Sequence, residues 1–202
     1  MPSDAAADGA CSAWDNGDCE GTPYCQPRCP RAFDDDGRPF VVRPVEAGDT
    51  DGLVSMYDAM SAETSTLGLP PRTRERTERW LAGLRGDGVN LVAVADGQVV
   101  GHAAAAPADD PDPELVVFVH PAHRGRGVGT ELLKHLIAHV DDRGCASLRL
   151  TVSEDNDRAV HVYDNLGFDV SERLRAELRM RLSLDDPLVD LVQRPPARRP
   201  TE

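Results

Sequence analysis

Residues 118–130, FVHPAHRGRGVGT, constrain the fold of this chain more than any other segment. The apolar run that ends at Val119 predicts a strand buried on both faces. Apolar residues at helical spacing from Val128 onward predict a helix. The turn between them holds two glycines and two arginines, and a third glycine follows Val128. Because a helix start presents free backbone N–H groups and the positive end of the helix dipole, this strand–turn–helix unit predicts an anion site.

The spacing of the turn residues narrows the kind of anion. Glycine lets the backbone approach a phosphate, and arginines add charge-assisted donors. The order Arg-Gly-Arg-Gly-Val-Gly fits neither GxxxxGK[ST] nor GxGxxG, so neither nucleotide motif is present. A tight turn that merely needs glycine is the alternative. The strand before the turn, Pro121 within it and the helix after it favour the anion site.

Hydrophobic periodicity predicts the other elements. They follow the order strand, two helices, three strands, helix, strand, helix and two strands, which is an α/β (α+β) arrangement with a mixed sheet and helices on its faces. We expect about six to seven strands and about four helices. Asp96-Gly97 between two apolar runs predicts a hairpin. The expected strands are 40–45, 90–95, 98–103, 115–119, 146–152, 168–170 and 178–182, and the expected helices are 49–60, 72–86, 128–143 and 157–166.

Three regions are expected along the chain. Residues 1–38 are rich in Gly, Pro, Asp and Cys without apolar periodicity, which predicts an irregular extension. Residues 39–184 form the folded domain. Residues 185–202 are rich in proline and charge, which predicts a flexible tail.

The charge balance is strongly acidic. The formal net charge is −13, and Lys134 is the only lysine. Either the surface serves a basic partner, or the protein works in a halophilic cytoplasm; the dispersal of the acids and the scarcity of lysine favour the second. In about 1 M salt the screening length is about 3 Å, so an anionic ligand must be held by direct contacts. The same balance argues against nucleic-acid binding.

No apolar run approaches the roughly 20 residues that cross a bilayer, so no membrane partner is expected. The N-terminus lacks a basic region followed by an apolar stretch, which predicts a cytoplasmic protein without a signal peptide.

Four of the five cysteines lie in the first 29 residues. Clustered cysteines in a reducing cytoplasm suggest metal more than disulfides, but the spacings are irregular and CxxC is absent. A zinc site, redox-active or free thiols, and no role therefore all stay open, and no metal ligand is assigned. Cys145 lies in an apolar pattern and is expected to be a buried small residue. The clustered residues are Cys11, Cys19, Cys25 and Cys29.

Two blocks resemble the GNAT superfamily of N-acetyltransferases. Residues 124–129 are similar to its Arg/Gln-x-x-Gly-x-Gly/Ala motif. Residues 156–168, NDRAVHVYDNLGF, are similar to its Asn-x-x-Ala-x-x-x-Tyr-x-x-x-Gly-Phe segment. The two blocks in this order are more specific than either alone. The resemblance covers about residues 40–184 and implies a mostly antiparallel sheet.

The resemblance implies acetyl-CoA as the acetyl donor and assigns residues to it. The strand at Phe118 and Val119 would bind the pantetheine arm through its backbone. The turn would hold the pyrophosphate, and Asn156 would lie near the cofactor. The turn residues are Arg124, Gly125, Arg126, Gly127, Val128, Gly129 and Thr130.

The resemblance also implies direct transfer, in which a neutral amine attacks the thioester carbon and backbone N–H groups stabilise the oxyanion. Tyr163 would protonate the departing thiolate, unless it only packs in the core. Glu114, at the start of the central strand, is the main candidate for the base, unless it is an exposed strand-end carboxylate. A bulge would reverse its face, so the sequence does not settle this point. Weaker candidates for the base are Asp112, His102 and His120.

The function implied is an acetyl-CoA-dependent N-acetyltransferase that acts on a primary amine of a small molecule or protein, as a monomer or homodimer. The alternative is a non-catalytic acyl-CoA-binding module whose Cys-rich extension docks a partner. A zinc-dependent interaction protein is a third hypothesis, which rests on the N-terminal cysteines.

Overall fold

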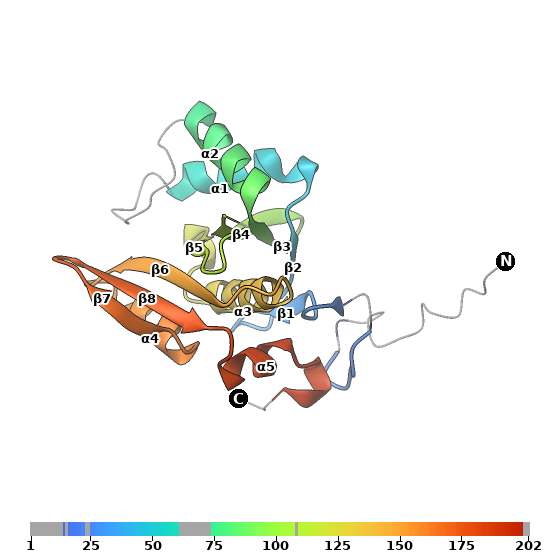
Figure 1. The fold of residues 1–202 in the computed structure, drawn as a ribbon. Coiled ribbons are helices and arrows are strands. Elements are labelled where there is room, and N and C mark those ends of the chain that lie inside the picture. The colour runs from blue at the N-terminus through green and yellow to red at the C-terminus, as the bar shows by residue number, and fades with distance from the viewer. Residues whose placement is uncertain (1–13, 15, 23–24, 61–73, 108, 200–202) are drawn as a thin grey trace.

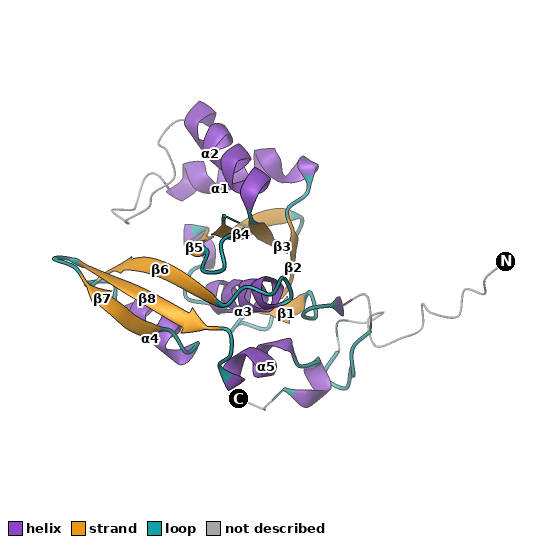
Figure 2. Cartoon of the chain, in the orientation of Figure 1, coloured by secondary structure: helices purple, strands orange, loops and turns teal. Residues whose placement is uncertain are grey.

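The computed structural model describes residues 14, 16–22, 25–60, 74–107 and 109–199 of the chain. One sheet has the strand order β1-β2-β3-β4-β5-β6-β8-β7, and helices cover both of its faces (Figures 1 and 2). The predicted class, a mixed and mostly antiparallel sheet with flanking helices, is confirmed. The described residues form eight strands and five α-helices, slightly more than predicted.

The elements lie close to their expected positions. The strands are β1 (Arg31–Phe33), β2 (Pro39–Pro44), β3 (Val89–Ala95), β4 (Gln98–Ala106), β5 (Glu114–Val119), β6 (Ser147–Ser153), β7 (Asp169–Arg173) and β8 (Glu177–Ser183). The α-helices are α1 (Thr50–Met60), α2 (Arg74–Asp87), α3 (Val128–Asp141), α4 (Asp157–Asn165) and α5 (Pro187–Gln193). The predicted hairpin joins β3 to β4, with φ of 50° at Asp96 and 75° at Gly97. Left-handed residues at both central positions are what a two-residue hairpin turn of type I′ requires.

The pairing of β5 with β6 differs from every other pairing in the sheet. All other neighbouring strands are antiparallel, whereas β5 and β6 are parallel. Glu114 opposite Arg149 is the one residue pair in register between them among the described residues. The two strands therefore part after the first residue of β5. A parallel pair that opens in this way leaves backbone groups of β5 without a strand partner.

Two hydrophobic cores lie on opposite faces of the sheet. The helices α1 and α2 cover one face of β3–β5, and α3 covers the other (Figure 1). The core beside α1 and α2 includes Leu53, Tyr57 and Phe118. The core beside α3 includes Leu115 and Leu132. The apolar faces of these helices account for their positions, because each helix buries its stripe against the strands.

Two segments differ from the prediction of irregular or flexible chain. Within residues 1–38, Ala32 is buried in β1, which extends the sheet at the free edge of β2. Within residues 185–202, α5 packs on α3 and buries Val189 and Val192. The residues at the start of α5 are typical of a helix N-terminus, although the segment as a whole is rich in proline and charge. Asp186 caps the helix by accepting the N–H of Leu188, and proline follows at the first helical position.

None of the described helices is both long enough and apolar enough to cross a bilayer.

Candidate functional site

The segment 124–129, here called the glycine loop, leads from β5 into α3. Gly125 has φ of 74° and Gly127 has φ of 78°, so both lie in the left-handed region that favours glycine. Gly127 is the N-cap of α3, and no side chain in the described part of the chain caps this helix start. The first N–H groups of α3 are therefore available to an anion.

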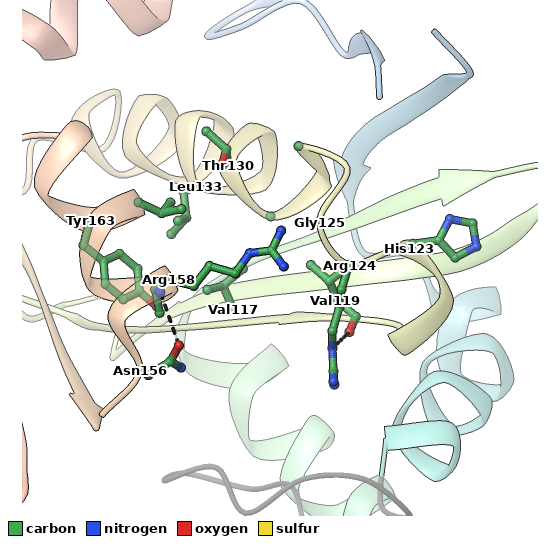
Figure 3. Close-up of a pocket in the computed structure, with 14 residues that line it drawn as sticks. Val117, Val119, His123, Arg124, Gly125, Thr130, Leu133, Asn156, Arg158 and Tyr163 are labelled. Carbon is green, nitrogen blue, oxygen red and sulfur yellow. Dashed lines mark hydrogen bonds between the residues drawn. The ribbon is translucent and has the colours of Figure 1, made fainter. Parts of the chain in front are cut away.

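A pocket of about 210 Å³ lies between the glycine loop, β5 and α4 (Figure 3). Figure 3 shows Thr130 and Leu133 from α3 on one side of it and Arg158 and Tyr163 from α4 on another. Eight of the twelve predicted site residues line this pocket. They are Val119, Arg124, Gly125, Gly127, Gly129, Thr130, Asn156 and Tyr163.

The structure does not bring Phe118 to the pocket. Its side chain is buried in the core beside α1 and α2, and its backbone pairs with His102 of β4. Two residues further along the chain, His120 and Val100 form a hydrogen-bonded pair, because the His120 N–H donates to the Val100 carbonyl at 2.9 Å. Since bonded and non-bonded pairs alternate in antiparallel ladders, the groups of Phe118 also point toward β4.

The same alternation directs the backbone of Val117 and Val119 away from β4, toward the opening beside β6. Both residues line the pocket. The Val119 carbonyl accepts a hydrogen bond from Arg124 Nε at 3.1 Å. With respect to the described residues, the backbone groups free to receive an extended ligand are therefore those of Val117 and the Val119 N–H.

Two further predicted residues lie outside the pocket. Val128 is buried against the sheet because its position on α3 faces the core. Arg126 turns away from the pocket and forms ion pairs with Asp34 and Asp36, which lie in the N-terminal extension. Local sequence patterns could not predict this contact, because 92 residues separate Arg126 from Asp34.

Arg158 supplies the pocket with a guanidinium that the sequence reasoning missed. It lies in the first turn of α4 and reaches across to the glycine loop, as Figure 3 shows. A Cβ added to Gly125 would lie 2.7 Å from Arg158 Nη2. Asn156 anchors the same helix start by accepting the Ala159 N–H at 3.2 Å. The signal was present, since Arg158 lies two residues after Asn156 within the second block.

His123 lines the pocket without adding a full positive charge. Burial lowers its pKa below the ordinary value of 6.5, and the nearby Arg126 and His120 lower it further. The imidazole is therefore neutral at pH 7. Arg124 and Arg158 remain as the charged donors at this pocket.

Tyr163 is 9% exposed and borders the pocket from α4. Burial raises the pKa of its hydroxyl to about 12. Its ring meets Phe168 edge-to-face at 5.8 Å between centroids. Among the described residues, no hydrogen-bond partner is seen for the hydroxyl. Tyr163 therefore holds its proton at neutral pH and keeps it available at the pocket.

Comparison with protein families identifies the family of this chain. A model of the acetyltransferase (GNAT) family matches residues 53–168, more than half of the chain. The chain belongs to the GNAT family. The match includes the glycine loop and the whole of α4, and it leaves the N-terminal extension outside.

Solved structures show the same GNAT fold. The GNAT domain of S. lividans PAT is 24% identical, with a TM-score of 0.65 over 76% of this chain and 95% of that one. The structure of yncA from Salmonella typhimurium with its cofactor acetyl-CoA is 22% identical, with a TM-score of 0.63 over 73% and 95%. A ribosomal-protein-alanine N-acetyltransferase from Brucella melitensis is 24% identical, with a TM-score of 0.61 over 71% and 99%.

Glu114 lies outside the pocket of this GNAT domain but beside the point where β5 and β6 part. The β4–β5 register is continuous, so no bulge reverses the alternation. Glu114 therefore projects from the same face as Val116 and Phe118, which is the face beside α1 and α2. Its carboxylate is exposed and lies 3.4 Å from Thr151 Oγ1 of β6.

The weaker candidates for the base all have structural partners. His102 is fully buried and bonded to Tyr57, with 2.6 Å between Nδ1 and the hydroxyl. Asp112 accepts from Ser147 and lies 3.7 Å from an Arg149 nitrogen. His120 accepts the Ala122 N–H at 3.2 Å. These contacts leave Glu114 as the most accessible carboxylate of the set.

Three cysteines of the N-terminal extension line a separate cavity of about 410 Å³. Cys19 and Cys29 are buried, and Cys25 is half-buried. No three His, Cys, Asp or Glu side chains in the described part of the chain form a group that could hold a metal ion. Cys11 lies outside the described residues. Cys145 is half-buried beside the core next to α3.

Proposed function

We propose that the chain is an acetyl-CoA-dependent N-acetyltransferase that transfers the acetyl group to a primary amine of a small molecule or protein. One observation carries this proposal: the glycine loop, the free backbone of β5 and the protonated Tyr163 all border a single pocket. Family membership supports it independently. Acetyl-CoA would supply the acetyl group as an activated thioester.

The pocket residues fit each part of this donor. The N–H groups at the start of α3 and the guanidinium groups of Arg124 and Arg158 would hold the pyrophosphate. Gly125 and Gly127 let the chain turn toward it. The backbone of Val117 and the Val119 N–H would bind the pantetheine arm as an added strand. Apolar side chains, Leu133 among them, would cover the arm.

Tyr163 and Glu114 divide the proton transfers between the two faces of the sheet. Glu114 would take the proton from the incoming ammonium, because a protonated amine has no lone pair for attack on the thioester carbon. Tyr163 would give its proton to the departing thiolate sulfur. Its raised pKa keeps it protonated at neutral pH.

Titration calorimetry with acetyl-CoA and a screen of amines for release of free CoA test this proposal. The amine panel includes polyamines, lysine peptides and peptides with free N-termini. We expect binding and turnover with at least one amine. Binding without turnover across the panel would favour the non-catalytic module, and no acetyl-CoA binding at any salt concentration would refute both.

We further propose that the protein acts as a monomer or homodimer in a salt-rich cytoplasm, and the composition supports the second part, the salt-rich setting. Its net charge is −13 with a single lysine. Direct contacts at the glycine loop would be screened little by salt, unlike long-range attraction. The affinity for CoA is therefore expected to fall only a few-fold between low salt and about 1 M salt.

A further inference from the structure

The strands β1 and β2 form a hairpin, and the connection between them begins with three consecutive aspartates, here called the aspartate turn (residues 34–36). All three contact the glycine loop. The Asp34 carboxylate forms an ion pair with Arg126 Nη2, and Asp36 Oδ2 lies 3.2 Å from Arg126 Nε. Asp35 donates its backbone N–H to the Arg126 carbonyl at 3.2 Å. The N-terminal extension therefore contacts Arg126 of the glycine loop through both the side chain and the backbone of that residue.

The aspartate turn is itself a fixed structure. Asp34 Oδ1 accepts the N–H of Asp36 at 3.1 Å and the N–H of Arg38 at 2.8 Å. Burial raises the pKa of Asp34, but the N–H of Arg38 and the charge of Arg126 more than offset this, and the net pKa is lowered. Asp34 is therefore charged at neutral pH. The Asp34 carboxylate has three such contacts. If it moved away, Asp36 would be the one remaining ion-pair partner of the half-buried Arg126 guanidinium among the described residues.

Arg126 is the residue between the two left-handed glycines of the loop. Fixing its carbonyl and its side chain therefore fixes the backbone on both sides of it. Gly127 makes room for this contact, since a Cβ there would lie 2.7 Å from Asp35 Oδ1. The side chain of Arg126 is only 16% exposed, and two carboxylates outweigh its charge. A guanidinium in that setting has little attraction for a phosphate.

We propose that Asp34 and Asp36 are positioning residues of the donor site, which act through Arg126 to hold the glycine loop in the shape that binds pyrophosphate. This inference rests on the proposed function. It gives the N-terminal extension, which lies outside the matched family region, a part in binding acetyl-CoA. In this proposal Arg126 fixes the loop through its contacts with Asp34 and Asp36. Arg158, together with Arg124, supplies the guanidinium groups that bind the phosphates.

A double-mutant cycle on the full chain tests the proposal, with CoA as the probe and calorimetry as the measurement. We expect Asp34→Asn and Arg126→Gln each to weaken CoA binding about tenfold, with the double variant no weaker than either. Tighter binding by Asp34→Asn would overturn the proposal, because it would mean that a released Arg126 binds the phosphates. Losses that multiply in the double variant would also overturn it.

Asp36→Asn provides a second variant, because this carboxylate is 57% exposed and its loss threatens the fold less. We expect a smaller loss of CoA affinity, about threefold. Glu20→Gln is the matched control, since it breaks another ion pair of the extension, at 2.8 Å with Arg198, away from the loop. Its CoA affinity should stay within twofold of wild type, and an equal loss there would overturn the proposal.

Hydrogen exchange of the ligand-free protein separates this proposal from the proposed function. Asp34→Asn should speed exchange of the glycine-loop amides while leaving β3 and β4 unchanged. Unchanged loop exchange would overturn the positioning role whether or not the protein binds CoA. Wild-type protein without CoA affinity would instead refute the proposed function. In steady state, the KM for acetyl-CoA should rise in this variant and the KM for the amine should not.

Discussion

The two faces of the sheet each bury a tyrosine, and the two tyrosines have opposite surroundings. Burial raises the pKa of both hydroxyls, to about 12 for Tyr163 and well above the ordinary value for Tyr57. Tyr163 borders the pocket beside the glycine loop, whereas Tyr57 lies beside α2 and meets the rings of Trp80, His102 and Phe118 edge-to-face. A perturbed pKa alone therefore does not identify a catalytic acid.

Hydrogen bonding explains the difference between the faces. Asn90 donates from Nδ2 to the Leu84 carbonyl at 2.7 Å, so its Oδ1 accepts from His102 Nε2, 3.3 Å away. This assigns His102 Nδ1 as the acceptor of the Tyr57 proton. The Tyr57 proton belongs to a closed chain of structural bonds, while that of Tyr163 faces a pocket. The following predictions test this contrast.

Tyr163→Phe should have the largest effect. We expect kcat to fall about 100-fold, because the departing thiolate loses its proton donor. The Kd for acetyl-CoA should stay within twofold, since the ring remains. Stopped-time CoA release and calorimetry measure the two quantities. An unchanged kcat would assign Tyr163 to packing alone.

Glu114→Gln should lower kcat/KM for the amine about 100-fold at neutral pH. The loss should shrink as the pH approaches about 10, where amines deprotonate unaided. A pH series for both proteins checks this. Glu172→Gln, on exposed β7, is the matched control and should behave as wild type. A loss that is the same at every pH would argue against Glu114 as the base.

Arg158→Gln should weaken CoA binding about tenfold, the size expected for one charge-assisted hydrogen bond. The glutamine keeps the stem but removes the charge. Arg143→Gln, exposed just beyond α3, controls for the change in net charge. Equal affinities for the two variants would place the pyrophosphate away from α4.

Tyr57→Phe should leave kcat within about threefold of wild type and lower the free energy of unfolding by about 1–2 kcal/mol. The cost arises because the buried His102 Nδ1 loses its donor. Urea unfolding measures it. A loss of kcat as large as that of Tyr163→Phe, without loss of stability, would remove the contrast between the faces.

The pH profile of wild-type kcat should show the smallest change. A raised pKa means that Tyr163 stays protonated, and thus active, until the pH nears about 12. No falling limb should therefore appear up to pH 10, the ordinary tyrosine pKa. A falling limb near pH 8 or 9 that Tyr163→Phe abolishes would contradict this assignment.

Local patterns predicted most of the fold and eight of the residues that line the pocket beside the glycine loop. The glycine loop, Asn156 and Tyr163 lie in two short blocks whose elements are set by nearby residues. Phe118 could not be distinguished from Val117, because the choice depends on which β5 groups pair with β4. Arg126 was predicted to bind the cofactor but lies outside the pocket, because its ion-pair partners, Asp34 and Asp36, lie in the N-terminal extension. No comparable motif marks a site for the acceptor amine, and residues 61–71, between two of the expected helices, lie outside the described residues.

The parting of β5 and β6 also bears on self-association. A sheet normally confines its unpaired backbone to its two outer edges, but in the described part of this one the backbone of Val117 and the Val119 N–H also form an unpaired edge, between the inner strands β5 and β6. Such an edge is a template for a strand from another molecule. An extended ligand that fills the gap would remove the template. Stocks of the ligand-free protein are therefore expected to aggregate on heating sooner than stocks saturated with CoA.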